Sequence, residues 1–271
     1  MIDRAHEAAE VALSAAREAS ALVMRVYADP FEVAYKSKDD PVTRADHESN
    51  ALLVDRLSRA FPGVPIVAEE SDPASYAGFA GADAIWFVDP LDGTREFVAR
   101  NGEFAVMIGL AEHGRATVGV ITAPAWGRAF VGVVGDGAWE VAADGSRKPI
   151  HVSSRTVIDG ASMVVSRSRT PPQLAALAAS IGRAPVILGS SGLKAAVVAA
   201  GEHDVYLQPG RAGMRWDACS ADALVRAAGG QFTESDGATI DYATPELVNA
   251  RGLLATNGLL HERIMEALAR I

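Results

Sequence analysis

The sequence predicts a protein of the α/β class with mixed, α+β character, and three observations lead to this class. Two helical patterns open the chain, strands joined by short turns lie between residues 104 and 141, and strands alternate with helices after about residue 150. Short turns favour antiparallel neighbours, whereas alternation favours a partly parallel sheet with helices on its faces. We therefore expect two domains, residues 1–145 and 146–271, joined through the polar segment 142–150.

Two helices and six strands are expected in the first domain. Apolar side chains recur at helical spacing over residues 3–27, which is typical of an amphipathic helix. A second helix is expected over about 44–60, because Asp46 stands three residues after Thr43, as in a capping box, and Pro62-Gly63 closes it. Apolar runs of strand length predict strands at residues 64–68, 84–88, 104–110, 116–122, 129–134 and 138–141.

The second domain is expected to alternate strands with helices. Strands are predicted at 161–165, 186–188, 204–207, 231–233 and 252–255. Helices are predicted at 171–181, 193–200, 216–228 and 259–268. This order favours a partly parallel sheet covered by helices.

Composition excludes several classes of function. The 271 residues hold 25 Lys and Arg against 34 Asp and Glu, a formal net charge of −9, with no long basic run. This excess of negative charge argues against sequence-independent binding to nucleic-acid phosphates. The single cysteine, Cys219, excludes an internal disulfide framework and a multi-cysteine metal cluster, and we expect it to be a packed apolar residue.

No targeting or membrane signal is evident in the sequence. Charges occupy positions 3, 4 and 7, where a signal peptide would place its apolar core. No window offers the roughly 18 consecutive apolar residues of a membrane-spanning helix. We therefore expect a cytoplasmic protein without a membrane span.

The most informative stretch is Trp86-Phe87-Val88-Asp89-Pro90-Leu91-Asp92-Gly93-Thr94. An apolar strand delivers Asp89 to its carboxyl end, the edge where α/β sheets place ligands. Asp89 and Asp92 would point to opposite faces of a regular strand, but a turn at Pro90-Leu91 can bring both carboxylates to one point. Gly93 permits a positive φ, and a helix starting there would offer N–H groups to a phosphate. An ordinary turn with an Asx hydrogen bond is the alternative, and this stretch alone leaves both open.

Further carboxylates stand at comparable places. Glu69-Glu70 ends a short apolar strand, and Asp217 lies at a predicted helix start, although a solvated strand end and a helix cap explain them equally well in isolation. If Glu69, Asp89, Asp92 and Asp217 converge at about 4 Å, each pair repels by roughly 1 kcal/mol in water and about 4 kcal/mol at an effective dielectric near 20. Such a cluster needs cations, and carboxylates without His or Cys partners favour Mg²⁺ over Zn²⁺.

Taken in order, these residues resemble the signature motifs of the inositol monophosphatase superfamily. The motifs are Glu69-Glu70, Asp89-Pro90-Leu91-Asp92-Gly93-Thr94 and Trp216-Asp217 followed by Ala228-Gly229-Gly230, and the resemblance begins at Lys38-Asp39-Asp40-Pro41-Val42-Thr43-Arg44-Ala45-Asp46. Within the superfamily, Thr94-Arg95-Glu96-Phe97 followed by Arg100-Asn101-Gly102-Glu103-Phe104 resembles the 3′(2′),5′-bisphosphate nucleotidases of the CysQ type. The resemblance implies a layered αβαβα sandwich and a Mg²⁺-dependent, lithium-sensitive phosphomonoesterase.

The resemblance also implies a role for each matching residue. Glu69, Asp89 and the Leu91 carbonyl would bind one Mg²⁺, and Asp89, Asp92 and Asp217 would bind a second. Glu70 would support the shell around a weaker third ion. Thr94, paired with Asp46, would orient and help deprotonate the attacking water, while the N–H groups of Gly93 and Thr94 would hold the phosphate.

The substrate contacts implied by the resemblance are Lys38, Ser166, Ser191, Lys194 and Arg211. A surface lysine on an amphipathic helix is the alternative for Lys194. The chain departs from the pattern at Gln208, where nucleotidases commonly carry an arginine for the second phosphate, although Arg211 or Arg215 could substitute. Adenosine 3′,5′-bisphosphate, cleaved to AMP and phosphate, is the leading substrate. Inositol 1-phosphate or a related small sugar phosphate is the alternative.

Two competing interpretations are disfavoured. Asp-x-x-Asp-Gly-Thr superficially resembles the Asp-x-Asp-Gly-Thr of haloacid-dehalogenase phosphatases, but its spacing is one residue longer and it falls at residue 89 rather than on a first strand. A non-enzymatic regulator acting through protein or RNA partners fits poorly with the acidic balance and the complete ligand set. We therefore expect an enzyme for a small phosphomonoester, monomeric or homodimeric, with no nucleic-acid polymer as partner.

Overall fold

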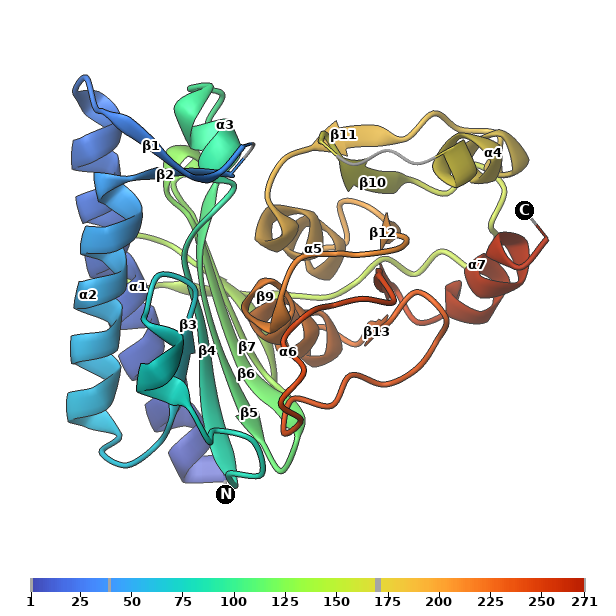
Figure 1. The fold of residues 1–271 in the computed structure, drawn as a ribbon. Helices are drawn as coiled ribbons and strands as arrows, with labels where there is room; N and C mark the ends of the chain where they lie inside the picture. The colour runs from blue at the N-terminus through green and yellow to red at the C-terminus, as the bar shows by residue number, and fades with distance from the viewer. Residues whose placement is uncertain (1, 39, 169–171, 271) are drawn as a thin grey trace.

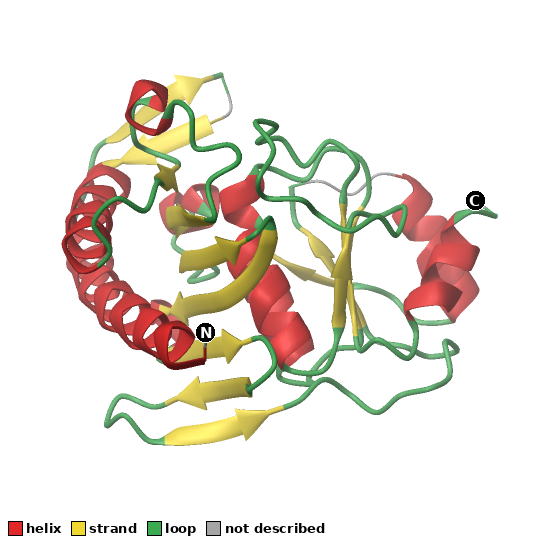
Figure 2. Cartoon of the chain, turned by 90° about the horizontal axis from the view of Figure 1, so that it is seen from below, coloured by secondary structure: helices red, strands yellow, loops and turns green. Residues whose placement is uncertain are grey.

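The computed structural model describes residues 2–38, 40–168 and 172–270, and it forms five layers (Figure 1; Figure 2). The outer layer holds α1 (Ile2–Ala28) and α2 (Arg44–Ala60), which lie side by side on one face of a seven-stranded sheet. Apolar side chains of both helices join a core cluster with Trp86, Ile108 and Val131 of that sheet. The capping box predicted for α2 is present, because Thr43 N donates to Asp46 Oδ2 at 2.7 Å and Ala45 N donates to Thr43 Oγ1 at 3.2 Å.

The first sheet is mostly an antiparallel meander, as predicted. Its order is β3-β4-β5-β6-β7-β8-β9, and only β3 and β4 run parallel to each other. The strands are β3 (Ile66–Ala68), β4 (Ala84–Asp92), β5 (Ala105–Glu112), β6 (Arg115–Ala123), β7 (Arg128–Val133), β8 (Gly137–Val141) and β9 (Arg147–Ile150). Short 3₁₀ helices η1 (Pro73–Tyr76) and η2 (Pro124–Trp126) lie in its connections.

Two features of the first half differ from the predictions. The expected connection over 142–150 contains β9, which pairs with β8, so the first sheet extends to Ile150; the division of the chain into domains 1–145 and 146–271 stays a prediction. A two-stranded hairpin, β1 (Val33–Ser37) and β2 (Asp40–Thr43), was not predicted. Its first strand is mostly exposed and lacks an apolar pattern, which explains why it gives no strand signal.

The second sheet is partly parallel, as expected. Its order is β11-β10-β12-β14-β13; β10 runs parallel to β11 and β12, and β14 runs antiparallel to its neighbours. The strands are β10 (Met163–Ser166), β11 (Val186–Leu188), β12 (Val205–Gln208), β13 (Gln231–Thr233) and β14 (Leu253–Thr256). On its outer face, α4 (Pro172–Ile181) and α7 (His261–Leu268) complete a small core with Met163 and Leu254. Pro171, the predicted start of that first helix, lies outside the described residues.

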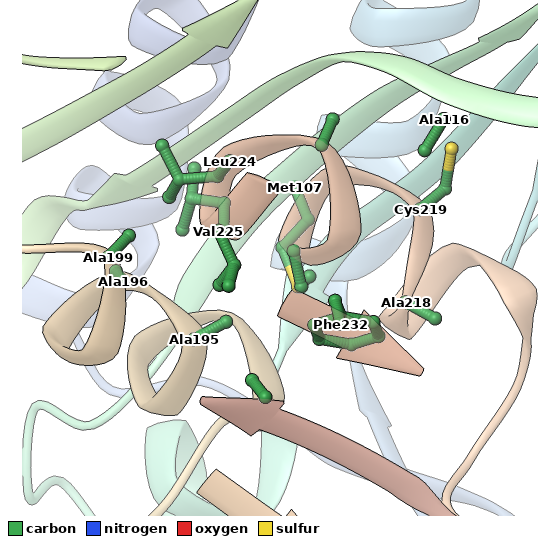
Figure 3. Packing of buried hydrophobic residues seen from close by; sticks show 14 of the residues in the cluster. Met107, Ala116, Ala195, Ala196, Ala199, Ala218, Cys219, Leu224, Val225 and Phe232 are labelled. Carbon is green, nitrogen blue, oxygen red and sulfur yellow. The ribbon is translucent and has the colours of Figure 1, made fainter. Parts of the chain in front are cut away.

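Helices α5 (Ser191–Ala199) and α6 (Cys219–Ala227) form the layer between the two sheets (Figure 1). One core cluster joins Met107 of β5, Cys219 and Val225 of α6 and Phe232 of β13 (Figure 3). Cys219 is fully buried, as predicted. The layer order is therefore αβαβα, which confirms the predicted sandwich. None of the helices in the described part of the chain is long and apolar enough to cross a membrane.

Three glycines set how closely α6 approaches the first sheet. Gly109, Gly119 and Gly132 are paired in register across β5, β6 and β7. A Cβ atom built on Gly119 would lie 2.1 Å from the carbonyl oxygen of Ser220, and one on Gly132 would lie 2.7 Å from Leu224 Cα. The backbone of α6 therefore packs directly against the backbone of these glycines, and this close packing fixes the position of the helix.

Candidate active site

A cavity of about 620 Å³ opens at the end of the molecule that carries the β1–β2 hairpin and α3 (Thr94–Val98) (Figure 1). Its walls come from the end of β4, the hairpin, the start of α5 and the loop after β12. All the predicted site residues line this cavity except Asp46 and Glu70. The cavity thus lies between the two sheets and draws on both halves of the chain.

Three carboxylates meet inside it. One ligand oxygen from each of Asp89, Asp92 and Asp217 lies within 4.8 Å of the others. Asp89 and Asp92 both belong to β4, which extends past the predicted end at residue 88. The pairing of β4 with β5 shifts register between Asp89 and Asp92, because three steps along β4 oppose two steps from Met107 to Ala105. This bulge cancels the alternation of a regular strand and brings both carboxylates to one side.

The third carboxylate comes from a different local structure than predicted. The expected helix over 216–228 is split into a 3₁₀ turn, η3 (Arg215–Asp217), and α6. Met214 N donates to Asp217 Oδ2 at 2.6 Å, so this carboxylate caps the short turn while it lines the cavity. Asp217 is therefore a cap of the short turn, and its predicted role as a metal ligand stays a prediction.

The electrostatics of the cluster favour a cation. Burial raises the pKa of Asp89 well above its usual value, and the negative charges of Glu69, Asp92 and Asp217 raise it further. Burial likewise raises the pKa of Glu69 to about 7. Burial and mutual repulsion thus disfavour the charged form of Asp89, and a bound divalent cation would offset both effects, because hard divalent cations prefer this all-oxygen set of donors. The residues present therefore fit a Mg²⁺ site.

Glu69 and Glu70 both bind the side chain of Lys36, a residue that the sequence analysis did not single out. Lys36 Nζ, on the hairpin, donates to Glu69 Oε1 at 2.9 Å and also to Glu70 Oε1. Glu69 lines the cavity without belonging to the three-carboxylate group, and Glu70 Oε2 lies 4.0 Å from His47 Nδ1 behind it. Because the hairpin gives no strand signal, only the nearness of Lys36 to the Lys38–Asp46 segment could have pointed to it. The predicted roles of both glutamates stay proposals.

Thr94 and Asp46 form the pair that was predicted. Thr94 Oγ1 donates to Asp46 Oδ1 at 2.9 Å and lies 3.1 Å from the Leu91 carbonyl oxygen. Asp46 is 1% exposed, and burial is the main cause of its raised pKa. Its other oxygen caps α2 through Thr43, so the helix cap fixes the carboxylate that receives the Thr94 hydroxyl.

The turn before α3 requires glycine. Gly93 has φ +94°, and a Cβ there would lie 2.9 Å from the carbonyl oxygen of Glu103. Helix α3 begins at Thr94, as predicted. The start of this helix therefore faces the cavity beside the carboxylates, where backbone N–H groups suit a phosphate.

The second half of the chain contacts Asp92 directly. Asp92 Oδ2 accepts hydrogen bonds from Gly192 N at 2.7 Å, from Ser191 Oγ at 3.2 Å and from Ser190 Oγ. Ser190 has φ +55° and caps α5 through Leu193 N. The N-terminus of α5 thus orients a carboxylate that belongs to the first sheet.

Lys194 is a buried lysine and not a surface one. It is 3% exposed, and its Nζ donates to the Ser190 carbonyl at 2.5 Å and lies 5.2 Å from the Tyr206 ring centroid. Burial lowers its pKa to about 8. The predicted contacts Lys38, Ser166, Ser191 and Arg211 line the same cavity, as does Gln208.

Arg215 is not available as the substitute for an arginine at position 208. Its side chain is buried, with Nη1 donating to Asn249 Oδ1 at 2.7 Å and Nη2 lying 3.7 Å from Glu234 Oε1. Arg95, which sequence reasoning left without a role, lines the cavity instead. Of the two proposed substitutes, only Arg211 lies in the cavity wall.

The chain is similar to known phosphatases in both sequence and fold. A sequence model of the inositol monophosphatase family matches residues 4–271. The 3′(2′),5′-bisphosphate nucleotidase CysQ of Salmonella typhimurium is 35% identical over 85% of this chain and 92% of its own length. Extragenic suppressor protein suhB from Bartonella henselae superposes with a TM-score of 0.81 at 26% identity, over 96% of this chain and 97% of that one. An inositol monophosphatase from Anabaena gives 0.80 at 29% identity, over 98% and 96%.

Proposed function

Because the chain belongs to the inositol monophosphatase family, and is thereby a phosphoric monoester hydrolase, we propose that it uses Mg²⁺ to cleave the 3′-phosphate of adenosine 3′,5′-bisphosphate, releasing AMP and phosphate. The observation that carries the metal-dependent part is the meeting of Asp89, Asp92 and Asp217 beside the start of α3. The choice of substrate is supported by the 35% identity to a bisphosphate nucleotidase.

In this proposal Asp89, Asp92, Asp217, Glu69 and the Leu91 carbonyl hold the ions. Bound Mg²⁺ would supply positive charge that acidifies the attacking water and offsets charge on the phosphate and the leaving oxygen. The protein does the rest by holding its own groups in place. Asp92 stays oriented because three donors at the start of α5 already bind its Oδ2.

Thr94 and Asp46 would handle the proton of the attacking water. Because the Thr94 hydroxyl donates to Asp46, its oxygen lone pairs are available to accept a hydrogen bond from water. A proton taken by Thr94 Oγ1 can be relayed to Asp46, whose raised pKa makes it a better acceptor than an exposed aspartate. The N–H groups of Gly93 and Thr94 would hold the phosphate oxygens.

The second phosphate would be held by the cations of the cavity wall. Lys38, Arg95, Lys194 and Arg211 line the same cavity as the three carboxylates. Four cationic side chains around one cavity suit a substrate with two phosphate groups better than one with a single phosphate and a neutral ring. Ser166 and Ser191 would contact the sugar and base.

One observation favours inositol 1-phosphate as the alternative substrate. Gln208, in the cavity wall, is a neutral amide that is only 4% exposed, at the place where nucleotidases commonly carry an arginine. A neutral amide recognises hydroxyl groups more readily than a dianionic phosphate.

A phosphate-release panel tests the proposal. Adenosine 3′,5′-bisphosphate, inositol 1-phosphate and fructose 1,6-bisphosphate are supplied at equal concentration, with Mg²⁺ or with a chelator. We expect Mg²⁺-dependent release that is greatest, in kcat/KM, for the adenosine compound. A large preference for inositol 1-phosphate would overturn the nucleotidase assignment, and release in the presence of chelator would overturn the metal-dependent mechanism.

A further inference from the structure

We propose that Asn249, in the loop before β14, is a positioning residue that sets the place of Asp217 in the metal site. It does not line the cavity, and its side chain is fully buried. The proposal rests on the proposed function, because it assumes that Asp217 binds a divalent cation. It assigns a role in the site to a residue about 30 positions further along the chain than that carboxylate.

Asn249 is hydrogen-bonded to three successive residues of the turn before Asp217. Its side-chain Nδ2 donates to the carbonyl oxygens of Ala212 at 3.1 Å and Met214 at 2.6 Å. Its backbone N donates to the Gly213 carbonyl at 3.0 Å, and its own carbonyl accepts from Ala212 N at 2.9 Å. Asn249 thus binds backbone carbonyl groups and a backbone N–H group of the turn. The turn cannot shift without breaking several of these buried hydrogen bonds.

Arg215 fixes which way the amide of Asn249 points. Arg215 Nη1 donates to Asn249 Oδ1 at 2.7 Å. A guanidinium only donates and a backbone carbonyl only accepts, so a flipped amide would lose all three side-chain bonds. Arg215 is in turn near Glu234, whose other oxygen lies 2.9 Å from Arg251 Nε. The orientation of Asn249 is therefore set by a buried arginine that is itself paired with a buried glutamate.

The turn held by Asn249 touches the carboxylate of Asp217. Met214 N donates to Asp217 Oδ2 at 2.6 Å, and Met214 is the residue whose carbonyl Asn249 binds. A Cβ built on Gly213 would lie 2.4 Å from Asp217 Oδ2, so the backbone of the turn packs directly against the carboxylate. Movement of the turn is therefore movement of the proposed ligand.

Asn249→Asp is the variant that tests this role, and Asn257→Asp is its matched control. The substitution at 249 keeps the size and the acceptor for Arg215 but removes the donors to Ala212 and Met214. Asn257 is 2% exposed, and its Nδ2 donates to Ser153 Oγ at 3.1 Å and to the Arg155 carbonyl at 2.7 Å, away from the cavity. Both variants lose buried donors, so both should unfold at lower temperature.

The discriminating readout is the binding of Mn²⁺ to the full chain without substrate, followed by electron paramagnetic resonance, together with the Mg²⁺ concentration that half-activates phosphate release. We expect Asn249→Asp to lower the Mn²⁺ affinity and to raise the half-activating Mg²⁺ concentration, each by about 10–100-fold. This is the range found when residues that support metal ligands are removed. Asn257→Asp should leave both as in the unmodified chain. Equal Mn²⁺ affinity in the two variants would overturn the positioning role.

A second variant covers the case in which Asn249→Asp does not fold. Arg215→Met removes the donor that orients the amide and should weaken Mn²⁺ binding in the same direction, whereas unchanged binding there would overturn the proposal. Failure of the unmodified chain to bind Mn²⁺ or to need Mg²⁺ would refute the proposed function itself. The two failures are thus distinguishable.

Discussion

Replacing Gly119 by alanine should displace α6 from the first sheet and carry Asp217 with it. The added Cβ would lie 2.1 Å from the carbonyl oxygen of Ser220, whereas ordinary contact begins at 3.4 Å. Helix or strand must therefore yield by more than 1 Å. Overpacking of this kind costs about 1–3 kcal/mol of unfolding free energy. Asp217 stands two residues before α6, and a misplacement of about 1 Å can lower turnover by about 100-fold.

Urea unfolding and Mg²⁺-dependent phosphate release measure the two effects separately. Gly135→Ala is the matched control, because Gly135 lies in the β7–β8 turn with φ +92° and has nothing within 4 Å of the added Cβ. The unfolding free energy of the control should fall by about 1–2 kcal/mol, because alanine is strained in the left-handed conformation, and its turnover should stay unchanged. If Gly119→Ala lost no more turnover than Gly135→Ala, the close packing of α6 would not position the site.

Two further predictions concern buried ionisable groups. Burial raises the pKa of Asp222 to about 6, so the folded chain binds this proton more tightly than the unfolded chain, and the stability it confers is complete below about pH 4 and lost as pH rises through 6. The unfolding free energy of Asp222→Asn should therefore rise relative to that of the unmodified chain by up to about 3 kcal/mol as the pH increases from 4 to 7.5, measured by urea unfolding. A difference between the two chains that does not change with pH would contradict this. Lys194→Met should raise KM for adenosine 3′,5′-bisphosphate about 10-fold or more. The unmodified KM should rise above pH 8, where Lys194 loses its charge, and the variant's should not; parallel pH profiles would exclude Lys194 as a phosphate ligand.

The sequence predicts those parts of the fold in which burial leaves a periodic pattern. Helices α1 and α2 and the strands of both sheets except β9 were placed because their apolar residues recur at helical or strand spacing. The β1–β2 hairpin was missed because its exposed side chains leave no such pattern, and Lys36 was missed with it. The β4 bulge was also invisible, although the meeting of Asp89 and Asp92 was predicted.

Distances between remote segments lie beyond what local patterns can give. Asp217 reaches Asp92 because the glycines of β5, β6 and β7 let α6 approach the sheet closely. Arg215 looked like a phosphate ligand from its place in the loop, and only its burial against Asn249 and Glu234 shows otherwise. Asn249 carried no motif at all, since its contacts are with backbone that lies far away in the chain.

The proposal that this chain is a Mg²⁺-dependent phosphatase with Asp217 as a metal ligand is tested most directly by the rate of phosphate release from adenosine 3′,5′-bisphosphate. The rate is measured during a Mg²⁺ titration for the unmodified chain and for Asp217→Asn. We expect that a chelator abolishes release, that Mg²⁺ restores it in the unmodified chain, and that Asp217→Asn stays folded but inactive. Release that continues in chelator, or that survives in a folded Asp217→Asn variant, would contradict the proposal.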